Sequence, residues 1–288
     1  MKPDPRFLKQ DKTFWANVRT ISQHVGYTVR VKGFIKVPTL DEIAAALEDL
    51  GLGTDHIIGP AGQPTKVGRL LHDYFDYRAE ALNVTVKPLL MDGDEARELY
   101  ERVRAELNIS RLAPMNKQSK EKKQPAYLTA IVNMLIEANA GKYPCDYDPH
   151  VLTTITRNKL PLRTFARRLD GAFPAAVNPV AVWEIKEYYY TTTFGSRVSD
   201  GVYESLLDGM EIEELREHEG IDVKHYLIAD ARFTWWVKGK SYLCRIADML
   251  HMGYVDEVLF GREVVDRIPA LVKEWVKGAR RRKTLPPK

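Results

Sequence analysis

One short stretch determines most of what this sequence predicts: it reads VAVWEIK and runs from Val180 to Lys186. An unbroken run of apolar, β-branched and aromatic residues is typical of a buried strand. Because side chains on a strand alternate between its two faces, Glu184 and Lys186 project to the same side. Burying an unpaired charge is costly, so a buried strand does not carry two charges for packing alone. The stretch therefore predicts a strand that ends in a functional site.

A second carboxylate lies upstream, in the short strand expected from Leu169 to Phe173. Asp170 precedes Glu184 by 184 − 170 = 14 positions. Two carboxylates and a lysine at a strand end suit a hard divalent cation and a polarised water. The carbonyl of Ile185 adds a third oxygen, because a strand end projects it into the same space. We therefore expect Asp170, Glu184 and Ile185 to bind Mg²⁺, for which Mn²⁺ substitutes, in the hydrolysis of DNA phosphodiester bonds.

The elements expected around this site alternate between strands and helices. Further strands are expected at 226–229 and 254–260, and helices at 127–140, 199–217, 241–250 and 264–277, with an interruption of the second helix near Asp208 and Gly209. This order predicts an α/β (α+β) fold with a mixed central sheet flanked by helices.

The N-terminal part, residues 1–113, is predicted to form a mainly helical domain. A basic linker or loop is expected at 114–125, and the nuclease domain at 126–288. Thr39 with Glu42 forms a capping box, and Thr65 caps a second helix. Two capped helices suggest a helix-turn-helix or winged-helix module that reads DNA, with Lys66 and Arg69 as the first side chains to test. A helical scaffold without DNA contacts fits the same pattern.

An acidic residue, a variable gap and Glu-x-Lys on an apolar strand resemble the motif of the PD-(D/E)xK nuclease superfamily. The match covers Asp170 to Phe260. The resemblance implies a restriction-endonuclease-like core in which Asp170 and Glu184 bind the metal and Lys186 is the catalytic lysine. Family members often add an acidic residue from a preceding helix, for which Glu137 is the candidate. Leu169 stands where the motif name has proline.

Other segments match parts of this pattern. Glu121-Lys122-Lys123 has the spacing but lies in a polar segment, and Asp222-Val223-Lys224 follows Asp208 by the same 222 − 208 = 14 positions. The run before Asp222 is less strand-like than the run before Glu184. A same-face ion pair on an exposed strand is a further interpretation of Glu184 and Lys186.

Two other groups of side chains could contact DNA. The segment 188–197 combines hydroxyls, a glycine and an arginine at a strand-to-helix junction, which suits phosphate contact through Ser196 and Arg197. It fits an aromatic patch over a sheet edge equally well. Lys238 and Lys240 follow the strand expected at 226–229 and could approach a backbone phosphate.

Within the superfamily, the sequence most resembles a type II restriction endonuclease, with double-stranded DNA as substrate. Palindromic cleavage predicts a homodimer and a DNA methyltransferase as functional partner. The alternatives are a structure-selective, repair or phage nuclease of the same superfamily, and a non-catalytic helix-turn-helix DNA-binding protein.

Composition excludes several classes of protein. The chain has 288 residues, a net charge of +4 and 44% hydrophobic residues, which excludes wholesale disorder and is compatible with a polyanionic partner. Its two cysteines, Cys145 and Cys244, are isolated, so zinc fingers and disulfide frameworks are poor interpretations. With no apolar run of about 20 residues and no signal peptide, we expect a cytoplasmic protein without membrane contact.

Overall fold

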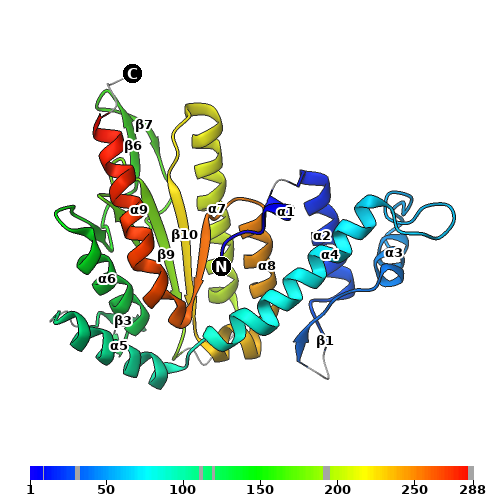
Figure 1. Ribbon diagram of the computed structural model, residues 1–288, viewed down its shortest axis with the longest axis horizontal. Coiled ribbons are helices and arrows are strands. Elements are labelled where there is room, and N and C mark those ends of the chain that lie inside the picture. Colours follow the sequence, from blue (N-terminus) through cyan, green and yellow to red (C-terminus); the bar gives the residue numbers. More distant parts are fainter. Residues whose placement is uncertain (9, 30–32, 110–112, 119–120, 191–194, 285–288) are drawn as a thin grey trace.

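The computed structural model describes residues 1–8, 10–29, 33–109, 113–118, 121–190 and 195–284. Figure 1 shows a helical N-terminal lobe beside a larger lobe built on a sheet. The predicted mixed sheet with flanking helices and a helical N-terminal part is confirmed, and the fold is α+β. Within the described chain, each helix is too short or too polar to cross a membrane.

The N-terminal lobe comprises residues 1–89 and packs around its own apolar cluster, which includes Phe14, Trp15 and Tyr74. Thr39 and Thr65 cap their helices as predicted, and Thr39 forms the capping box with Glu42. The elements are α1 (Pro5–Leu8), α2 (Lys12–Val25), β1 (Thr28–Val29), β2 (Phe34–Ile35), α3 (Leu40–Glu48), α4 (Lys66–Glu80), η1 (Ala81–Val86) and η2 (Lys87–Leu89).

The sheet lobe contains the five-stranded sheet, in the order β11-β10-β9-β8-β5. Strands β9, β10 and β11 are parallel, whereas β8 is antiparallel to both β9 and β5. The elements are α5 (Gly93–Leu107), β3 (Met115–Gln118), β4 (Glu121–Pro125), α6 (Tyr127–Ala140), β5 (Asp146–Tyr147), β6 (Thr154–Arg157), β7 (Leu160–Thr164), β8 (Gly171–Phe173), β9 (Ala181–Glu187), α7 (Ser196–Glu219), β10 (Lys224–Asp230), η3 (Arg232–Lys238), α8 (Lys240–His251), β11 (Glu257–Phe260), η4 (Gly261–Glu263) and α9 (Val264–Thr284).

Helices cover both faces of this sheet. Helices α5, α6 and α9 pack on one face, where Trp183 of β9 stacks on Trp275 of α9 with ring centroids 5.4 Å apart. Helices α7 and α8 pack on the other face, against residues such as Val182 and Leu227. The two faces of β9 therefore differ: Trp183 and Ile185 face α6 and α9, whereas Glu184 and Lys186 face α7.

Helix α7 departs from its sequence-based prediction, because it runs from Ser196 to Glu219 without the interruption expected near Asp208 and Gly209. Gly209 serves close packing there: a Cβ atom at this position would lie 2.4 Å from the carbonyl oxygen of Tyr254. The glycine that suggested a break is thus required by the neighbouring loop, while the helix passes through it.

The segment expected as a linker at 114–125 contains the hairpin of β3 and β4, which was not predicted. On one side of it, α5 packs against α6 through Leu99, Tyr100 and Val103. Packing therefore joins α5 to the sheet lobe, and the chain passes between lobes near Leu90, whereas the predicted domain boundary follows residue 113.

Asp230, the last residue of β10, holds this passage between the lobes. Its Oδ1 accepts hydrogen bonds from the backbone N–H groups of Met91 and Ala231, both at 2.8 Å, and its Oδ2 accepts one from the Tyr189 hydroxyl at 2.6 Å. The carboxyl group is fully buried, and its desolvation raises the pKa of Asp230 to about 7. A backbone hydrogen bond from Arg232 N–H to the Met91 carbonyl, 2.7 Å long, secures the same segment.

A buried ion pair also joins the two lobes. Arg78 of α4 donates to Asp248 of α8 at 2.9 Å, and the Tyr74 hydroxyl donates to the same carboxylate at 2.6 Å. Because both charged side chains are buried, the pair fixes the angle between α4 and α8, and removing one partner would leave the other uncompensated.

We predict that Gly171→Ala destabilises the protein by about 2 kcal/mol, because it overpacks the core beside β9. A Cβ atom at Gly171 would lie 2.0 Å from the fully buried indole of Trp183. The measurement is the free energy of unfolding in urea. The matched control is Gly278→Ala in α9, where the nearest atom is 3.8 Å away, so the higher helix propensity of alanine should stabilise. Equal stability of wild type and Gly171→Ala would contradict the packing.

We predict that Asp230→Asn removes a pH dependence from folding. The folded-state pKa of Asp230 lies above that of the unfolded chain, so the folded protein binds the proton more tightly and loses stability as the pH rises from about 4 to about 7. The variant should match wild type at pH 4 and exceed its free energy of unfolding by up to roughly 4 kcal/mol at pH 8. Substituting exposed Asp55 by Asn should leave the pH profile of wild type unchanged. Parallel profiles for Asp230→Asn and wild type would refute the assignment.

Candidate functional site

Pairing of β8 with β9 brings the two predicted metal-binding carboxylates together. Gly171 pairs with Trp183 in the antiparallel ladder, so Asp170 and Glu184 form the next pair along it. Asp170 Oδ2 accepts a hydrogen bond from Ile185 N–H at 2.7 Å, and Asp170 N–H donates to Glu184 Oε1 at 3.2 Å. Each carboxylate is thus held by the backbone of the opposite segment, which fixes both positions.

Lys186 lies on the same face of β9, as the alternation of side chains predicts. Its Nζ donates to Glu184 Oε2 at 2.6 Å and to Glu204 of α7 at 3.1 Å. Glu184 is fully buried, and the Lys186 side chain is 9% exposed. Gly201 of α7 permits this approach, because a Cβ atom there would lie 3.2 Å from Lys186 Cδ.

Arg167 completes the cluster, and the sequence analysis did not identify it. Its Nη1 contacts Glu184 Oε1 at 3.0 Å and Asp208 Oδ2 at 2.7 Å, and its Nη2 contacts Glu184 Oε2 at 3.1 Å and Glu204 Oε2 at 3.2 Å. Arg167 lies three positions before Asp170, in the segment between β7 and β8. Only the run of basic residues before Asp170 could have signalled it.

We call the set Arg167, Asp170, Glu184, Lys186, Glu204 and Asp208 the carboxylate cluster. It contains four carboxylates and two cationic side chains, so negative charge exceeds positive charge when all are ionised. Desolvation alone would raise the pKa of Glu184, but Lys186 and Arg167 outweigh it and hold that pKa below its usual value. Likewise, burial alone would lower the pKa of Lys186, but Glu184 and Asp170 raise it above its usual value.

The pKa values of Asp170 and Asp208 shift in the opposite direction from that of Glu184. Asp170 is exposed as a residue, but protein atoms crowd its carboxyl group, and this desolvation together with repulsion from Glu184 raises its pKa to about 6. Desolvation and the charge of Glu184 also raise the pKa of Asp208, to about 7. Asp208 Oδ1 is buried and accepts no hydrogen bond.

The donor set suits a hard divalent cation, although in the described chain no three acidic, histidine or cysteine side chains are arranged to enclose a metal ion. Asp170 Oδ2 accepts from Ile185 N–H, so its other oxygen, Oδ1, is the one that could bind a cation. Because the N–H of Ile185 points to Asp170 and the two backbone polar groups of a strand residue point the same way, the Ile185 carbonyl faces the same side. Glu184 limits metal binding, since both of its oxygens already contact cationic side chains.

Glu137 does not join the cluster. It lies exposed on α6, which packs on the Trp183 face of the sheet, whereas Glu184 projects from the opposite face. The side chain from a helix that joins Glu184 and Lys186 is Glu204 of α7. A glutamate eight positions into a helix has no distinguishing pattern in the sequence.

Two pairs of predicted DNA-binding residues lie on or next to elements that contact β9, namely α7 and η3. Ser196 and Arg197 begin α7, and the Arg197 guanidinium lies 5.9 Å from the centroid of the Tyr188 ring. The residues at 191–194, part of the same predicted phosphate-binding segment, lie outside the described chain. On the other side, η3 is tied to the site strand, because Trp235 Nε1 donates to the Lys186 carbonyl at 3.3 Å.

A basic and aromatic surface surrounds η3. Lys238 lies over the Phe233 ring at 5.7 Å, and Lys240 and Lys87 lie over the Trp236 ring at 5.0 and 5.5 Å. Among the described residues, no carboxylate forms an ion pair with these three lysines. Partial burial and repulsion from Lys87 lower the pKa of Lys240, as expected where cations gather without counter-ions.

Lys66 and Arg69 lie elsewhere, at the start of α4, which Figure 1 shows at the far side of the N-terminal lobe from the sheet. Arg69 donates to the Pro64 carbonyl at 2.7 Å. The rival motif is not assembled either: Lys224 pairs with Asp222 and Asp256, whereas Asp208 contacts Arg167.

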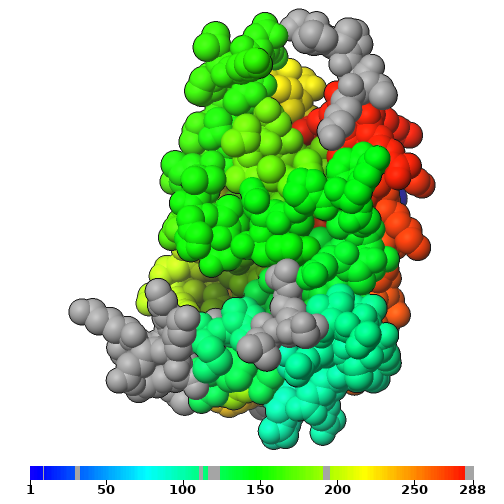
Figure 2. Space-filling model, turned by 90° about the vertical axis from the view of Figure 1, so that its left-hand side faces the viewer, coloured from blue at the N-terminus to red at the C-terminus, as the bar shows by residue number. Residues whose placement is uncertain are grey.

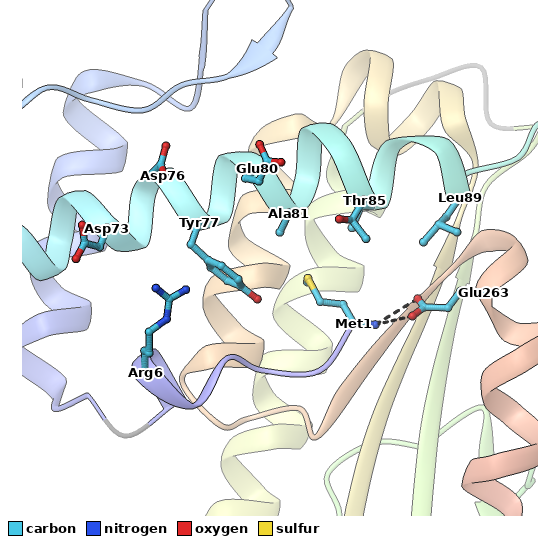
Figure 3. A pocket seen from close by; sticks show the side chains of 11 residues that line it. Met1, Arg6, Asp73, Asp76, Tyr77, Glu80, Ala81, Thr85, Leu89 and Glu263 are labelled. Carbon is cyan, nitrogen blue, oxygen red and sulfur yellow. Dashed lines mark hydrogen bonds and ion pairs between the residues drawn. The ribbon is translucent and has the colours of Figure 1, made fainter.

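The molecular surface is hollowed on the side toward the start of α7. Figure 2 shows this hollow between the green part of the sheet lobe and the blue-green α5, with the yellow-green start of α7 recessed in it. A separate pocket of about 560 Å³ lies between α1, α4 and η4. Its lining includes Arg6 but also Asp73 and Glu263, and Glu263 pairs with the amino group of Met1 (Figure 3), so the pocket does not suit a polyanion.

Comparisons with known proteins match the chain in two adjoining parts. Residues 1–85 match the family model described as Domain of unknown function (DUF7690), and residues 91–275 match the one described as Domain of unknown function (DUF7687). The matches meet where the chain passes between the lobes. No curated protein and no solved structure matches.

We predict that Glu184→Gln destabilises the fold by about 3 kcal/mol or more, because it leaves Arg167 and Lys186 as partly uncompensated buried cations. Lys186→Met should cost less, because Glu184 then keeps both contacts with Arg167. Urea unfolding at pH 7.5 measures both, with Glu204→Gln, whose side chain is 43% exposed, as the mild control. A larger loss in Lys186→Met than in Glu184→Gln would contradict this ordering.

Proposed function

This chain belongs to the DUF7687 family, and from the geometry of its carboxylate cluster we propose that it is a magnesium-dependent endonuclease that cuts double-stranded DNA. One observation carries the proposal: Asp170 and Glu184 face each other across β8 and β9, and Lys186 contacts Glu184 from the same face. The motif that this sequence resembles needs these three side chains close together, so the arrangement supports the proposal.

The order of elements supports a restriction-endonuclease-like core. A helix, α6, precedes an antiparallel pair, β8 and β9, and the crossover helix α7 leads to the parallel strand β10. In the proposed core the acidic residues lie on the antiparallel pair, and the crossover helix covers them.

The proposed roles follow from the charges. Asp170, Glu184 and the Ile185 carbonyl would hold Mg²⁺, for which Mn²⁺ substitutes, and a bound ion of this kind neutralises phosphate charge and lowers the pKa of a water ligand. Lys186 has a pKa raised above its usual value, so it is protonated at neutral pH and acts as a hydrogen-bond donor. It orients the attacking water and stabilises the extra negative charge of the transition state.

DNA binding is proposed on both flanks of the cluster. Ser196 and Arg197 present the N-terminus of α7, where backbone N–H groups favour a phosphate. Lys238 and Lys240, with Lys87, supply unpaired cations over aromatic rings, a combination that suits a nucleic-acid backbone. The N-terminal lobe would add contacts at a greater distance from the scissile bond.

Within nucleases we favour a type II restriction endonuclease that acts as a homodimer at a short specific site and is paired with a DNA methyltransferase. A structure-selective, repair or phage nuclease uses the same cluster. The non-catalytic helix-turn-helix interpretation is less favoured, because the connection between α3 and α4 runs from Asp49 to Thr65 and is longer than a tight turn.

We predict that Asp170→Asn and Lys186→Met each reduce cleavage of DNA by about 100-fold or more, because each removes a group that stabilises charge in the transition state. Purified protein is incubated with Mg²⁺ and supercoiled plasmid, linear genomic DNA or a four-way junction. Discrete fragments from plasmid and genomic DNA indicate a restriction enzyme, whereas cutting of the junction alone indicates a structure-selective nuclease.

The matched control is Lys224→Met, which removes a lysine from the neighbouring strand and the rival motif. It should cut like wild type. DNA binding, measured by fluorescence anisotropy in Ca²⁺, should stay within a few-fold for Asp170→Asn. Full cleavage by both cluster variants, or loss of cleavage in Lys224→Met alone, would overturn the site assignment.

A further inference from the structure

Arg167 occupies the place in the cluster where added positive charge is most favourable. It reaches three carboxylates at once, Glu184, Glu204 and Asp208, at distances between 2.7 and 3.2 Å. Its side chain is 23% exposed, so water screens these contacts only in part. A guanidinium in such a setting competes directly with any cation that approaches the same oxygens.

Glu184 makes this competition unavoidable. Its Oε1 accepts from Asp170 N–H and Arg167, and its Oε2 accepts from Lys186 and Arg167. A metal ion that shares Glu184 with Asp170 must therefore displace one of these donors. Asp170 N–H is fixed by the backbone, and Lys186 is held within β9, so Arg167 is the donor on a separate segment that can move.

The cluster also contains a place for Arg167 to move to. Asp208 is fully buried, and its Oδ1 accepts no hydrogen bond, although its Oδ2 already binds Arg167 Nη1. An unsatisfied buried oxygen is costly and favours a donor that turns toward it. Glu204 lies one turn before Asp208 on α7 and already contacts Nη2. A small rotation of the guanidinium would exchange Glu184 for a paired contact with Asp208.

We propose that Arg167 is a displaceable counter-ion of the metal site. It holds Glu184 in the metal-free protein and passes to Glu204 and Asp208 when a divalent cation binds between Asp170 and Glu184. Arg167 is thus a positioning residue, and it sets the metal affinity by competition. The inference rests on the proposed function, because it requires that the cluster binds a divalent cation.

The experiment measures Mn²⁺ binding without DNA, by electron paramagnetic resonance of free Mn²⁺ and by calorimetry. Arg167→Gln removes the competing charge, and we expect it to bind Mn²⁺ on the order of ten-fold more tightly than wild type. Arg167→Lys, which keeps one charge but loses the fork of the guanidinium, should lie between them. This second variant also keeps the test available if the glutamine variant folds poorly.

Asp208→Asn tests the other half of the proposal. An amide at position 208 binds the Arg167 guanidinium more weakly than a carboxylate does, so Arg167 leaves Glu184 less readily. Mn²⁺ should therefore bind several-fold more weakly than in wild type. In the Arg167→Gln background the same substitution should change Mn²⁺ affinity much less, because no guanidinium remains to move to residue 208. Equal effects in both backgrounds would show that Asp208 acts through its charge alone and would overturn the exchange.

The matched control is Arg163→Gln. Arg163 of β7 is exposed to a similar degree, 27%, and pairs with Glu214 of α7, but it does not contact the cluster. Its removal should leave Mn²⁺ affinity unchanged. If wild type binds Mn²⁺ and Asp170→Asn does not, yet Arg167→Gln binds equally or more weakly, the inference fails while the metal site stands. If wild type and Arg167→Gln both bind no Mn²⁺, the proposed function fails as well.

Discussion

The structure depends on one constraint: Glu184 is a fully buried carboxylate on a central strand, and it requires cations around it. Lys186 comes from the same strand, and Arg167 comes from the segment before β8. Arg167 and Lys186, which compensate this charge, also contact Glu204 of α7. Compensation of Glu184 therefore connects the segment before β8 to α7. The same contacts bring Asp170 beside Glu184, so the requirement for stability and the proposed chemistry arise from the same residues.

The passage between the lobes has a similar design, at the end of the strand that pairs with β9. Asp230 ends the strand next to β9 and binds the backbone at Met91, where the N-terminal lobe gives way to the sheet lobe. Trp235, a few residues later, donates to the carbonyl of Lys186. The site strand is thus connected to the lobe junction through one short segment, which offers a route by which contacts made by the N-terminal lobe could affect the cluster.

How much of this could be predicted from the sequence depends on whether the signal is local. The run before Glu184 predicted β9, and alternation placed Glu184 and Lys186 on one face, because strand geometry has a period of two. Asp170 followed from a motif spacing. Glu204 and Asp208 could not be found in this way, because their proximity to the site depends on how α7 crosses the sheet. Arg167 could not be found either, because its contact with Glu184 depends on the path of the segment between β7 and β8. Glu137 was misplaced for the same reason: an acidic residue on a helix carries no information about which face the helix covers.

The carboxylate cluster contains more carboxylates than cationic side chains. Four acidic groups lie around two cationic side chains, and desolvation together with the charge of Glu184 raises the pKa values of Asp170 and Asp208. In the proposed function a divalent cation would supply the positive charge that Arg167 and Lys186 do not. A site that served stability alone would gain from complete neutralisation. The excess of carboxylates next to the Ile185 carbonyl therefore supports the proposal that a divalent cation binds there.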